Sequence, residues 1–291
     1  MGDHIDTRAV GLDTALALIR WLTGAENLHY GLWTGLDVNA GNLRAAQDAY
    51  TDLLFAELPP GRLRILDIGG GAGETAKKLI ALGHQVEIVV PSAYLAGCCR
   101  RNAPDATVHE CRFEDYTGTG PFDLCLFSES FQYIPMMDSL PKCAALLTPE
   151  GHVLIADCFR TDAYLGRAQH GPQPGGGHRL SSFRAALLSN PFDVLTEQDI
   201  TDAVAPSIDL EQGLYNVIGT GFTQAEREIK ARKALVHWSL TRLTHLFLTR
   251  KRRENLMQRL VEQQRNSEAF RTYNTYLMTK LVRSRPKSND G

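Results

Sequence analysis

The sequence has no apolar run that approaches the ~20 residues required for a helix to cross a bilayer. Its first six residues include the acids Asp3 and Asp6, unlike the basic and then apolar leader of a secreted protein. The missing apolar run argues against a membrane-spanning helix. The acidic start argues against export, so we expect a cytoplasmic protein.

Cysteine spacings typical of zinc sites are also missing. The six cysteines, at positions 98, 99, 111, 125, 143 and 158, form no C-x-x-C pair, and four of them lie in segments that we predict to be core strands or helices. Reduced, buried thiols are therefore favoured over zinc ligands or disulfides. We expect no metal at the functional site.

The net charge of −2 conceals an asymmetry. Residues 226–291 carry 16 Lys/Arg and 6 Asp/Glu, whereas the remainder carries 15 and 27. The basic run at 250–253 could bind RNA, an anionic membrane or a phosphorylated acceptor. Glutamates at 254 and 262 interleave with the arginines, and helical spacing would spread the charge over several faces, so a solvated helix surface is favoured. We find no nucleic-acid-binding module and expect no nucleic-acid partner.

The chain is organised around residues 64–74. An apolar run from Leu63 to Ile68 contains one acid, Asp67, and is followed by alternating glycines and then by a helical pattern. This order predicts a buried strand, a tight turn and a helix. Glycine lets a ligand approach the main chain, and the helix start offers free N–H groups. A nucleotide-like cofactor fits such a turn, although a purely structural turn is the competing interpretation.

The glycine spacing decides which cofactor is favoured. A dinucleotide fingerprint would need a further glycine at Glu74 or Ala76, and neither position has one. The pattern instead resembles motif I of class I S-adenosylmethionine (SAM) dependent methyltransferases, in which the loop wraps the methionine half of SAM and the acid supports the loop and the amine. The resemblance implies that SAM is the cofactor and that its loop is formed by Asp67, Gly69, Gly71 and Gly73.

A second motif precedes this loop. The segment His29-Tyr30-Gly31-Leu32-Trp33 resembles the "HYG-W" segment of a subset of these enzymes that includes sterol, tocopherol and cyclopropane-fatty-acid methyltransferases. The resemblance implies that Tyr30 covers SAM and makes His29 a weaker catalytic candidate. An aromatic-rich turn that plugs one end of the core is the alternative.

Strands at 85–90, 106–112, 121–127 and 153–157 alternate with helices, which predicts a parallel sheet joined by right-handed crossovers. The family usually ends its second strand with an acid that binds the ribose hydroxyls.

In this chain Val90 stands where the family has the acid that binds the ribose, and Ser92 is the candidate to bind the ribose hydroxyls in its place. After the third strand the family commonly has an acid near adenine. Arg112 stands there, followed by Phe113, which we expect against the adenine ring, and Glu114, which we expect at its edge.

The fourth strand leads into a candidate acceptor site. The residues after it resemble the "ES-x-E/Q-H/Y" stretch of sterol and tocopherol methyltransferases, with Ser128 facing the cofactor, and Glu129 and Tyr133 facing the acceptor. Glu129 could act as a general base or stabilise developing positive charge. A carboxylate that caps a helix start is the alternative. His178, in the glycine-rich loop 171–179, could act as a base when the loop closes, but a solvated histidine is favoured.

These features predict an α/β, Rossmann-like class I methyltransferase with a seven-stranded, mostly parallel sheet, helices on both faces and an inserted helical lid. The expected parts are an N-terminal helical cap segment (1–60), the SAM-binding core (61–204), the lid (205–268) and a last strand with a basic tail (269–291).

The expected reaction is methyl transfer from SAM to carbon, nitrogen or oxygen of a small hydrophobic metabolite. A SAM-fold protein without methyl transfer, such as a cyclase or scaffold, and an RNA methyltransferase are the alternatives. A homodimer remains open.

Overall fold

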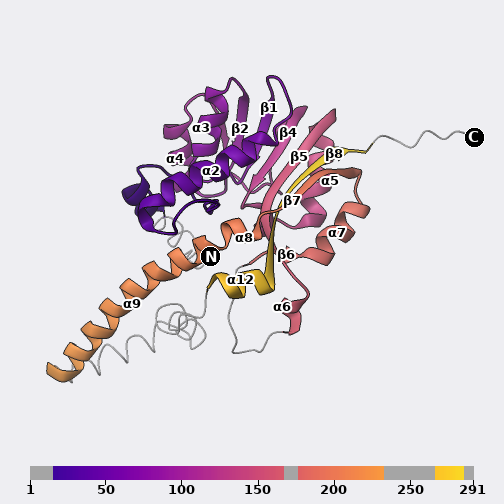
Figure 1. Cartoon of the computed structure of the whole chain (residues 1–291). Coiled ribbons are helices and arrows are strands. Elements are labelled where there is room, and N and C mark those ends of the chain that lie inside the picture. Colours follow the sequence, from indigo (N-terminus) through magenta and orange to yellow (C-terminus); the bar gives the residue numbers. More distant parts are fainter. Residues whose placement is uncertain (1–15, 167–175, 233–265, 285–291) are drawn as a thin grey trace, which may run out of the picture.

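The computed structural model describes residues 16–166, 176–232 and 266–284 (Figure 1). The basic run at 250–253 and most of the predicted lid, residues 233–265, lie outside the described residues.

The centre of the fold is a mixed β-sheet whose strands follow the order β3-β2-β1-β4-β5-β8-β7. Strands β1 to β5 run parallel, and β8 is antiparallel to both of its neighbours, β5 and β7. The short β6 pairs with β5 outside this path. The strands are β1 (Arg64–Ile68), β2 (Gln85–Val89), β3 (Thr107–His109), β4 (Phe122–Ser128), β5 (Leu147–Arg160), β6 (His178–Arg179), β7 (Phe192–Asp199) and β8 (Asn274–Arg283). The predicted Rossmann-like, mostly parallel sheet is confirmed, with the short β6 as an eighth strand beside the seven expected.

Helices cover both faces of the sheet (Figure 1). One apolar core lies under α2 (Leu43–Ala56), α3 (Glu74–Ala81) and α4 (Ala93–Asn102), and the other lies under α5 (Met136–Leu146) and α7 (Leu180–Leu188). The other described helices are residues 16–23, η1 (Ala40–Asn42), η2 (Phe131–Tyr133), α6 (Ala163–Gly166), α8 (Thr201–Val204), α9 (Pro206–Arg232) and α12 (Ser267–Tyr273). None of the helices in the described ranges is both long and apolar enough to cross a membrane.

Strand β1 is nearly continuous in its apolar residues because it is covered on both faces. Ile65, Leu66 and Ile68 are buried, and β1 pairs with β2 on one side and with β4 on the other. The chain moves outward from β1 through β2 to β3 and then returns to β4 beside β1. This change of direction opens a crevice at the carboxyl ends of β1 and β4, where open α/β sheets bind ligands.

Two segments differ from the sequence prediction. The expected turn at 148–152 lies inside β5, which begins at Leu147 and pairs with β4 through a register shift. His178, predicted in a flexible loop, belongs to β6 and pairs with Phe159 of β5. The main chain passes so close to β5 that a Cβ on Gly177 would lie 2.4 Å from the Cys158 carbonyl oxygen. Long-range pairing, which local composition does not encode, fixes this segment.

The region predicted as a lid begins with one long helix. Figure 1 shows α9 running away from the sheet. Ile208 near its start is buried, whereas Val217 is 72% exposed. All six cysteines are free thiols and five are buried, whereas the sequence placed four of them in core strands or helices.

Candidate active site

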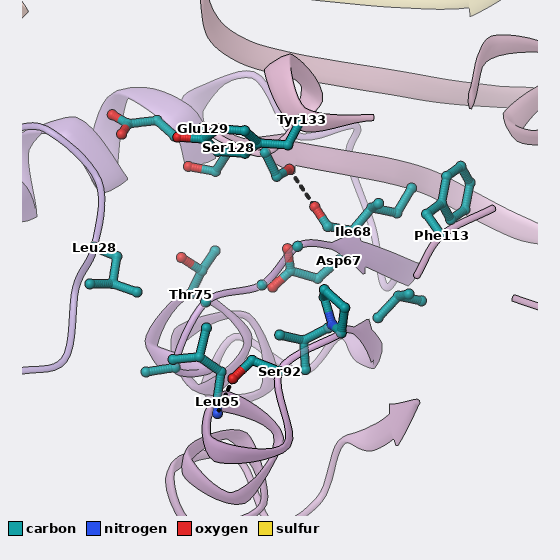
Figure 2. A pocket seen from close by; sticks show the side chains of 18 of the residues that line it. Leu28, Asp67, Ile68, Thr75, Ser92, Leu95, Phe113, Ser128, Glu129 and Tyr133 are labelled. Atoms are coloured by element: carbon teal, nitrogen blue, oxygen red, sulfur yellow. Dashed lines mark hydrogen bonds between the residues drawn. The ribbon is translucent and has the colours of Figure 1, made fainter. Parts of the chain in front are cut away.

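A cavity of about 880 Å³ opens at the carboxyl ends of β1, β2 and β4. Its wall includes the glycine loop after β1, the start of α4, the residues after β3 and the end of β4. In Figure 2, Ser128, Glu129 and Tyr133 lie along one side, Ser92 and Leu95 lie along the opposite side, and Asp67 lies between them. The structure therefore brings most of the predicted site residues to one cavity.

Two positions of the loop require glycine, because each has a positive φ and no room for a Cβ. Gly69 has φ of +77°, and a Cβ there would lie 2.4 Å from the Ser130 Cβ, so the loop can pass under the end of β4 only without a side chain. Gly73 caps α3 with φ of +88°, and its Cβ would lie 2.9 Å from the Cys99 Cα. Gly69 and Gly71 line the cavity, whereas Gly73 serves the close packing of α3 on α4.

Asp67 is a buried acid in the cavity wall, and one of its two carboxylate oxygens is enclosed and unpaired within the described ranges. The residue is 1% exposed, and its Oδ2 has no hydrogen-bond partner among the described residues. Burial raises the pKa of Asp67 to about 7. An unsatisfied buried carboxylate oxygen is costly, and a ligand that brings an N–H or O–H donor would remove the cost. The ammonium group of SAM fits this requirement.

The part of the cavity wall formed by the residues after β2 and β3 is less polar than the part around Asp67. Val90 is buried at the end of β2, where the family usually has an acid. The Ser92 hydroxyl accepts a hydrogen bond from the Leu95 N–H at 3.3 Å and so caps α4, which leaves its own hydrogen able to donate toward the cavity. Phe113 is buried in the wall, and Glu114 is exposed beside it. A ring wall with a carboxylate beside it suits an adenine, so this wall also fits SAM.

Glu129 is held in an uncommon backbone conformation directly after β4. Its φ is +57°, a region that costs a non-glycine residue on the order of 1–2 kcal/mol. The Glu129 N–H donates to the Ala156 carbonyl at 2.8 Å, which ties the residue to β5. Strain at a cavity wall, fixed by the surrounding sheet, is typical of functional sites.

The Glu129 carboxylate is tightly positioned. Its Oε1 accepts hydrogen bonds from the Tyr30 N–H at 2.7 Å and from the Tyr276 hydroxyl at 3.1 Å. Burial raises the pKa of Glu129 to about 8, against the opposing effect of the Tyr30 N–H and with a further contribution from Asp157. At neutral pH such a group can exist in both protonation states, which is what proton transfer requires.

Sequence reasoning missed two tyrosines behind this wall. Ser128 Oγ lies 3.1 Å from the Tyr50 hydroxyl, which in turn lies 2.8 Å from the Tyr276 hydroxyl. Tyr50 falls in the predicted N-terminal helical cap segment (1–60) and Tyr276 in the predicted last strand and basic tail (269–291), and neither was predicted at the site. The available signal was chemical, because a buried tyrosine hydroxyl usually finds a polar partner.

Two other predicted residues lie at or near the cavity. Tyr133 is 59% exposed and lines the cavity. Tyr30 is not among the lining residues, and its ring lies 6.2 Å from that of Phe270 and 6.3 Å from that of Tyr276. The Tyr30 contribution seen in the structure comes from its main-chain N–H.

The two histidines differ in position. His29 lines the cavity but stacks on Tyr50 at 4.5 Å, its Nδ1 lies 2.8 Å from the Tyr30 carbonyl oxygen, and burial lowers its pKa to about 4. His29 is therefore neutral at pH 7, with Nδ1 as the donor. His178 Nε2 lies 3.0 Å from the Phe131 carbonyl oxygen and 2.9 Å from that of Ile134, and His178 does not line the cavity.

Comparison with known proteins agrees with this geometry. The model of the family described as "Methyltransferase domain" matches residues 40–197, more than half of the chain. A similar curated protein is the ubiquinone biosynthesis O-methyltransferase of Xanthomonas axonopodis pv. citri (strain 306), 26% identical over 164 residues that cover 52% of this chain and 69% of that protein.

Solved structures share the fold over most of their length. The geranyl diphosphate C-methyltransferase of Streptomyces coelicolor A3(2), in complex with Mg²⁺, geranyl-S-thiolodiphosphate and S-adenosyl-L-homocysteine, has a TM-score of 0.62 at 15% identity and covers 92% of this chain and 91% of that one. The [4+2]-cyclase SpnF has a TM-score of 0.62 at 15% identity, with 96% of each chain covered. The chain belongs to the methyltransferase-domain family and is a class I, SAM-dependent methyltransferase.

Proposed function

We propose that this methyltransferase transfers the methyl group of SAM to a small, hydrophobic metabolite and that Glu129 serves the acceptor side. The observation that carries the proposal is the placement of Glu129. A strained backbone and two hydrogen bonds to Oε1 hold its carboxylate at the cavity, and its pKa is raised to about 8. A fixed acid near neutrality is the group that an acceptor with an ionisable proton requires.

Two parts of the cavity wall would bind different parts of SAM. Asp67 and the main chain of Gly69 and Gly71 would bind the amino-acid end of SAM, and Phe113 with Glu114 would flank the adenine. Bound there, SAM supplies an electrophilic methyl group on a sulfonium. The chain then has to orient the acceptor, exclude water and manage one proton, and orientation alone can contribute many powers of ten in rate.

Glu129 would take the acceptor proton. With its Oε1 occupied by the Tyr30 N–H and the Tyr276 hydroxyl, we assign the proton to Oε2. An acceptor without an ionisable proton would instead be stabilised by the negative charge as positive charge develops on it. Both roles leave the methylated atom open among carbon, nitrogen and oxygen.

The apolar part of the wall supports a hydrophobic acceptor. Apart from the residues assigned above to the cofactor, the lining includes Leu28, Tyr133 and the buried Ile134. The relatives named as ubiquinone biosynthesis O-methyltransferases and the geranyl diphosphate C-methyltransferase carry names of small-molecule enzymes, which agrees with this choice. We propose a natural product, an isoprenoid or a lipid-like compound as the substrate class.

We also propose that the chain belongs to the subset with the HYG-W segment. A Cβ on Gly31 would lie 2.5 Å from the Ala46 Cβ, so this residue allows the segment to pack on α2. The Trp33 Nε1 donates to the Ser207 hydroxyl at 2.8 Å, which ties the segment to α9. These contacts place the Tyr30 N–H against Glu129, and they support a functional role for the segment over a simple plug.

A second candidate function keeps the fold and gives up methyl transfer. Val90 takes the place of the usual ribose-binding acid, and the cyclase SpnF covers nearly the whole chain in the structural comparison. The RNA alternative depends on the basic run at 250–253, which lies outside the described residues.

One experiment separates these candidates. The full chain would be mixed with methyl-labelled SAM and a metabolite extract, and its binding of SAM and S-adenosylhomocysteine would be measured by isothermal titration. We expect both ligands to bind and label to appear in a low-mass, organic-extractable product, with excess S-adenosylhomocysteine suppressing the transfer. Binding without transfer would favour the second candidate, and no binding at millimolar ligand would overturn the proposal.

A further inference from the structure

Behind the cavity wall, polar groups from three elements form a continuous hydrogen-bonded chain. Ser128 Oγ lies 3.1 Å from Tyr50 Oη, Tyr50 Oη lies 2.8 Å from Tyr276 Oη, and Tyr276 Oη lies 3.1 Å from Glu129 Oε1. Both tyrosines are fully buried, whereas Ser128 and Glu129 line the cavity. Ser128 and Glu129, which are neighbours in the sequence, are therefore also linked by hydrogen bonds through Tyr50 of α2 and Tyr276 of β8.

The number of hydrogens limits how this chain can be arranged. Tyr276 Oη has one hydrogen and three acceptors within reach: Glu129 Oε1, Tyr50 Oη and the Ala156 carbonyl oxygen at 3.3 Å. An ionised carboxylate is the strongest of these acceptors. When Glu129 is charged, Tyr276 therefore donates to it, Tyr50 donates to Tyr276, and Ser128 donates to Tyr50.

The arrangement can reverse when Glu129 is neutral. A carboxylic acid is a weaker acceptor, so the Tyr276 hydrogen is free to turn to Tyr50 or to the Ala156 carbonyl. Tyr50 can then donate to Ser128, and the Ser128 hydrogen points to the cavity. No proton leaves its own oxygen in this change, and only the O–H directions differ.

We infer that Tyr276 and Tyr50 are positioning residues that couple the protonation of Glu129 to the orientation of the Ser128 hydroxyl in the cavity wall. The inference rests on the proposed role of Glu129 as the acceptor-side acid. When Glu129 takes a proton, Ser128 becomes a donor toward the cavity, so the wall offers a new hydrogen bond at the stage when the methylated product is present.

Other titratable groups also lie near Glu129, among them Asp157, whose own pKa burial raises to about 7, and each must be kept in every variant tested. Asp157 of β5 and Glu211 of α9 both raise the pKa of Glu129. Asp157 is held in place by hydrogen bonds from the Gln132 and Cys158 N–H groups and from the Gln132 side chain. His29 is neutral at pH 7. Exchanging tyrosine for phenylalanine removes one hydroxyl and leaves all of these groups in the chain.

The test follows the titration of Glu129 in the full chain. Glutamate labelled with carbon-13 at the side-chain carboxyl would be monitored by NMR as a function of pH, and the Glu129 signal would be assigned as the one lost in Glu129→Gln. The variants are Tyr276→Phe, Tyr50→Phe and Ser128→Ala. Tyr116→Phe is the matched control, because this buried tyrosine contacts Glu87 instead of Glu129. Thermal unfolding would establish that each variant is folded.

We expect Tyr276→Phe to raise the pKa of Glu129 by about one unit, a tenfold change in its ionisation constant, because the charged form loses a donor. Tyr50→Phe should raise it by a few tenths of a unit, because Tyr276 then loses the donor that orients it. Ser128→Ala should have the smallest effect of the three, and Tyr116→Phe should have none.

A merely structural role for the two tyrosines would lower the melting temperature and leave the Glu129 titration where it is, and that result would overturn the inference. A shift in Tyr276→Phe without one in Tyr50→Phe would reduce Tyr276 to a simple partner of Glu129 and would also overturn the relay. The proposed function fails differently, because methyl transfer that survives Glu129→Gln would remove the role of Glu129 and leave these pKa shifts intact.

Discussion

The ends of the neighbouring strands β1 and β4 each bring a carboxyl group with a raised pKa to the cavity, but the surroundings of the two groups differ. On the β1 side, Asp67 is buried with an oxygen that has no partner among the described residues. On the β4 side, Glu129 is tied down by the Tyr30 N–H and by Tyr276. An unpaired acid requires a donor from a ligand, whereas an organised acid is ready to accept a proton. The first side is therefore suited to binding and the second to chemistry.

The largest effect expected from this contrast is on the β4 side. Glu129→Gln should lower the rate of methyl transfer by about 10² to 10⁴, the range for loss of a general acid or base, with SAM affinity unchanged. Initial rates with labelled SAM and isothermal titration measure the two quantities. Glu150→Gln, an exposed acid within β5, is the matched control and should change neither. Normal turnover in Glu129→Gln would contradict the assignment of Glu129 to the chemical step and of Asp67 to binding.

The pH dependence of stability should show the cost of the buried acids. The pKa of Asp67 is raised to about 7 in the folded chain, so the folded state holds a proton that the unfolded state releases near pH 4. Stability should therefore fall as pH rises from about 4 to about 7, by on the order of 4 kcal/mol for Asp67 alone. Urea unfolding of the ligand-free chain would measure the trend, and Asp67→Asn should reduce its slope, with the contribution of Glu129 remaining. A steady rise in stability over this range would contradict the assignment.

On the β1 side, Asp67→Asn should weaken SAM binding. A hydrogen bond to a charged partner contributes about 1.5–3 kcal/mol, so the affinity should fall by about tenfold to a hundredfold. The measurement is titration calorimetry at pH 8, where Asp67 is mostly ionised. The matched control is Asp123→Asn in β4, because Asp123 accepts a hydrogen bond from the Arg64 N–H and does not line the cavity. Equal affinities for the wild type and Asp67→Asn would show that the unpaired oxygen is not a ligand-binding group.

The smallest effect expected is a gain at the less polar wall. Val90→Asp would place an acid at the end of β2, where it can accept hydrogen bonds from the ribose hydroxyls. One such hydrogen bond contributes about 1 kcal/mol, so SAM affinity should rise by about fivefold, with some loss of stability from the buried charge. Isothermal titration with SAM and with its 2′,3′-dideoxy analogue would test this, because only SAM should gain. An equal change for both would mean that the ribose does not lie against β2.

Local patterns were enough to predict the strand, glycine loop and helix around Asp67, because the apolar run and the glycine spacing are encoded in consecutive residues. They also placed Ser128 and Glu129 correctly at the end of a strand, and the parallel sheet then brought them to Asp67. The Tyr50–Tyr276 contact could not be predicted, because its partners are 226 positions apart and meet only through the pairing of β8 with β5.

His178 shows the same limit. Its glycine-rich surroundings indicate a loop, yet the structure pairs it with Phe159 and directs its ring to the Phe131 and Ile134 carbonyls. The left-handed conformation of Glu129 was equally hidden, since the sequence around it contains no glycine to mark a positive φ.

The most direct test of the account is a crystal structure of the chain grown with S-adenosylhomocysteine. The account predicts the ligand in the cavity, with its ammonium group at the Asp67 carboxylate, its adenine against Phe113 and its sulfur turned toward Glu129. A ligand bound elsewhere, or a cavity that stays empty at saturating ligand, would contradict it.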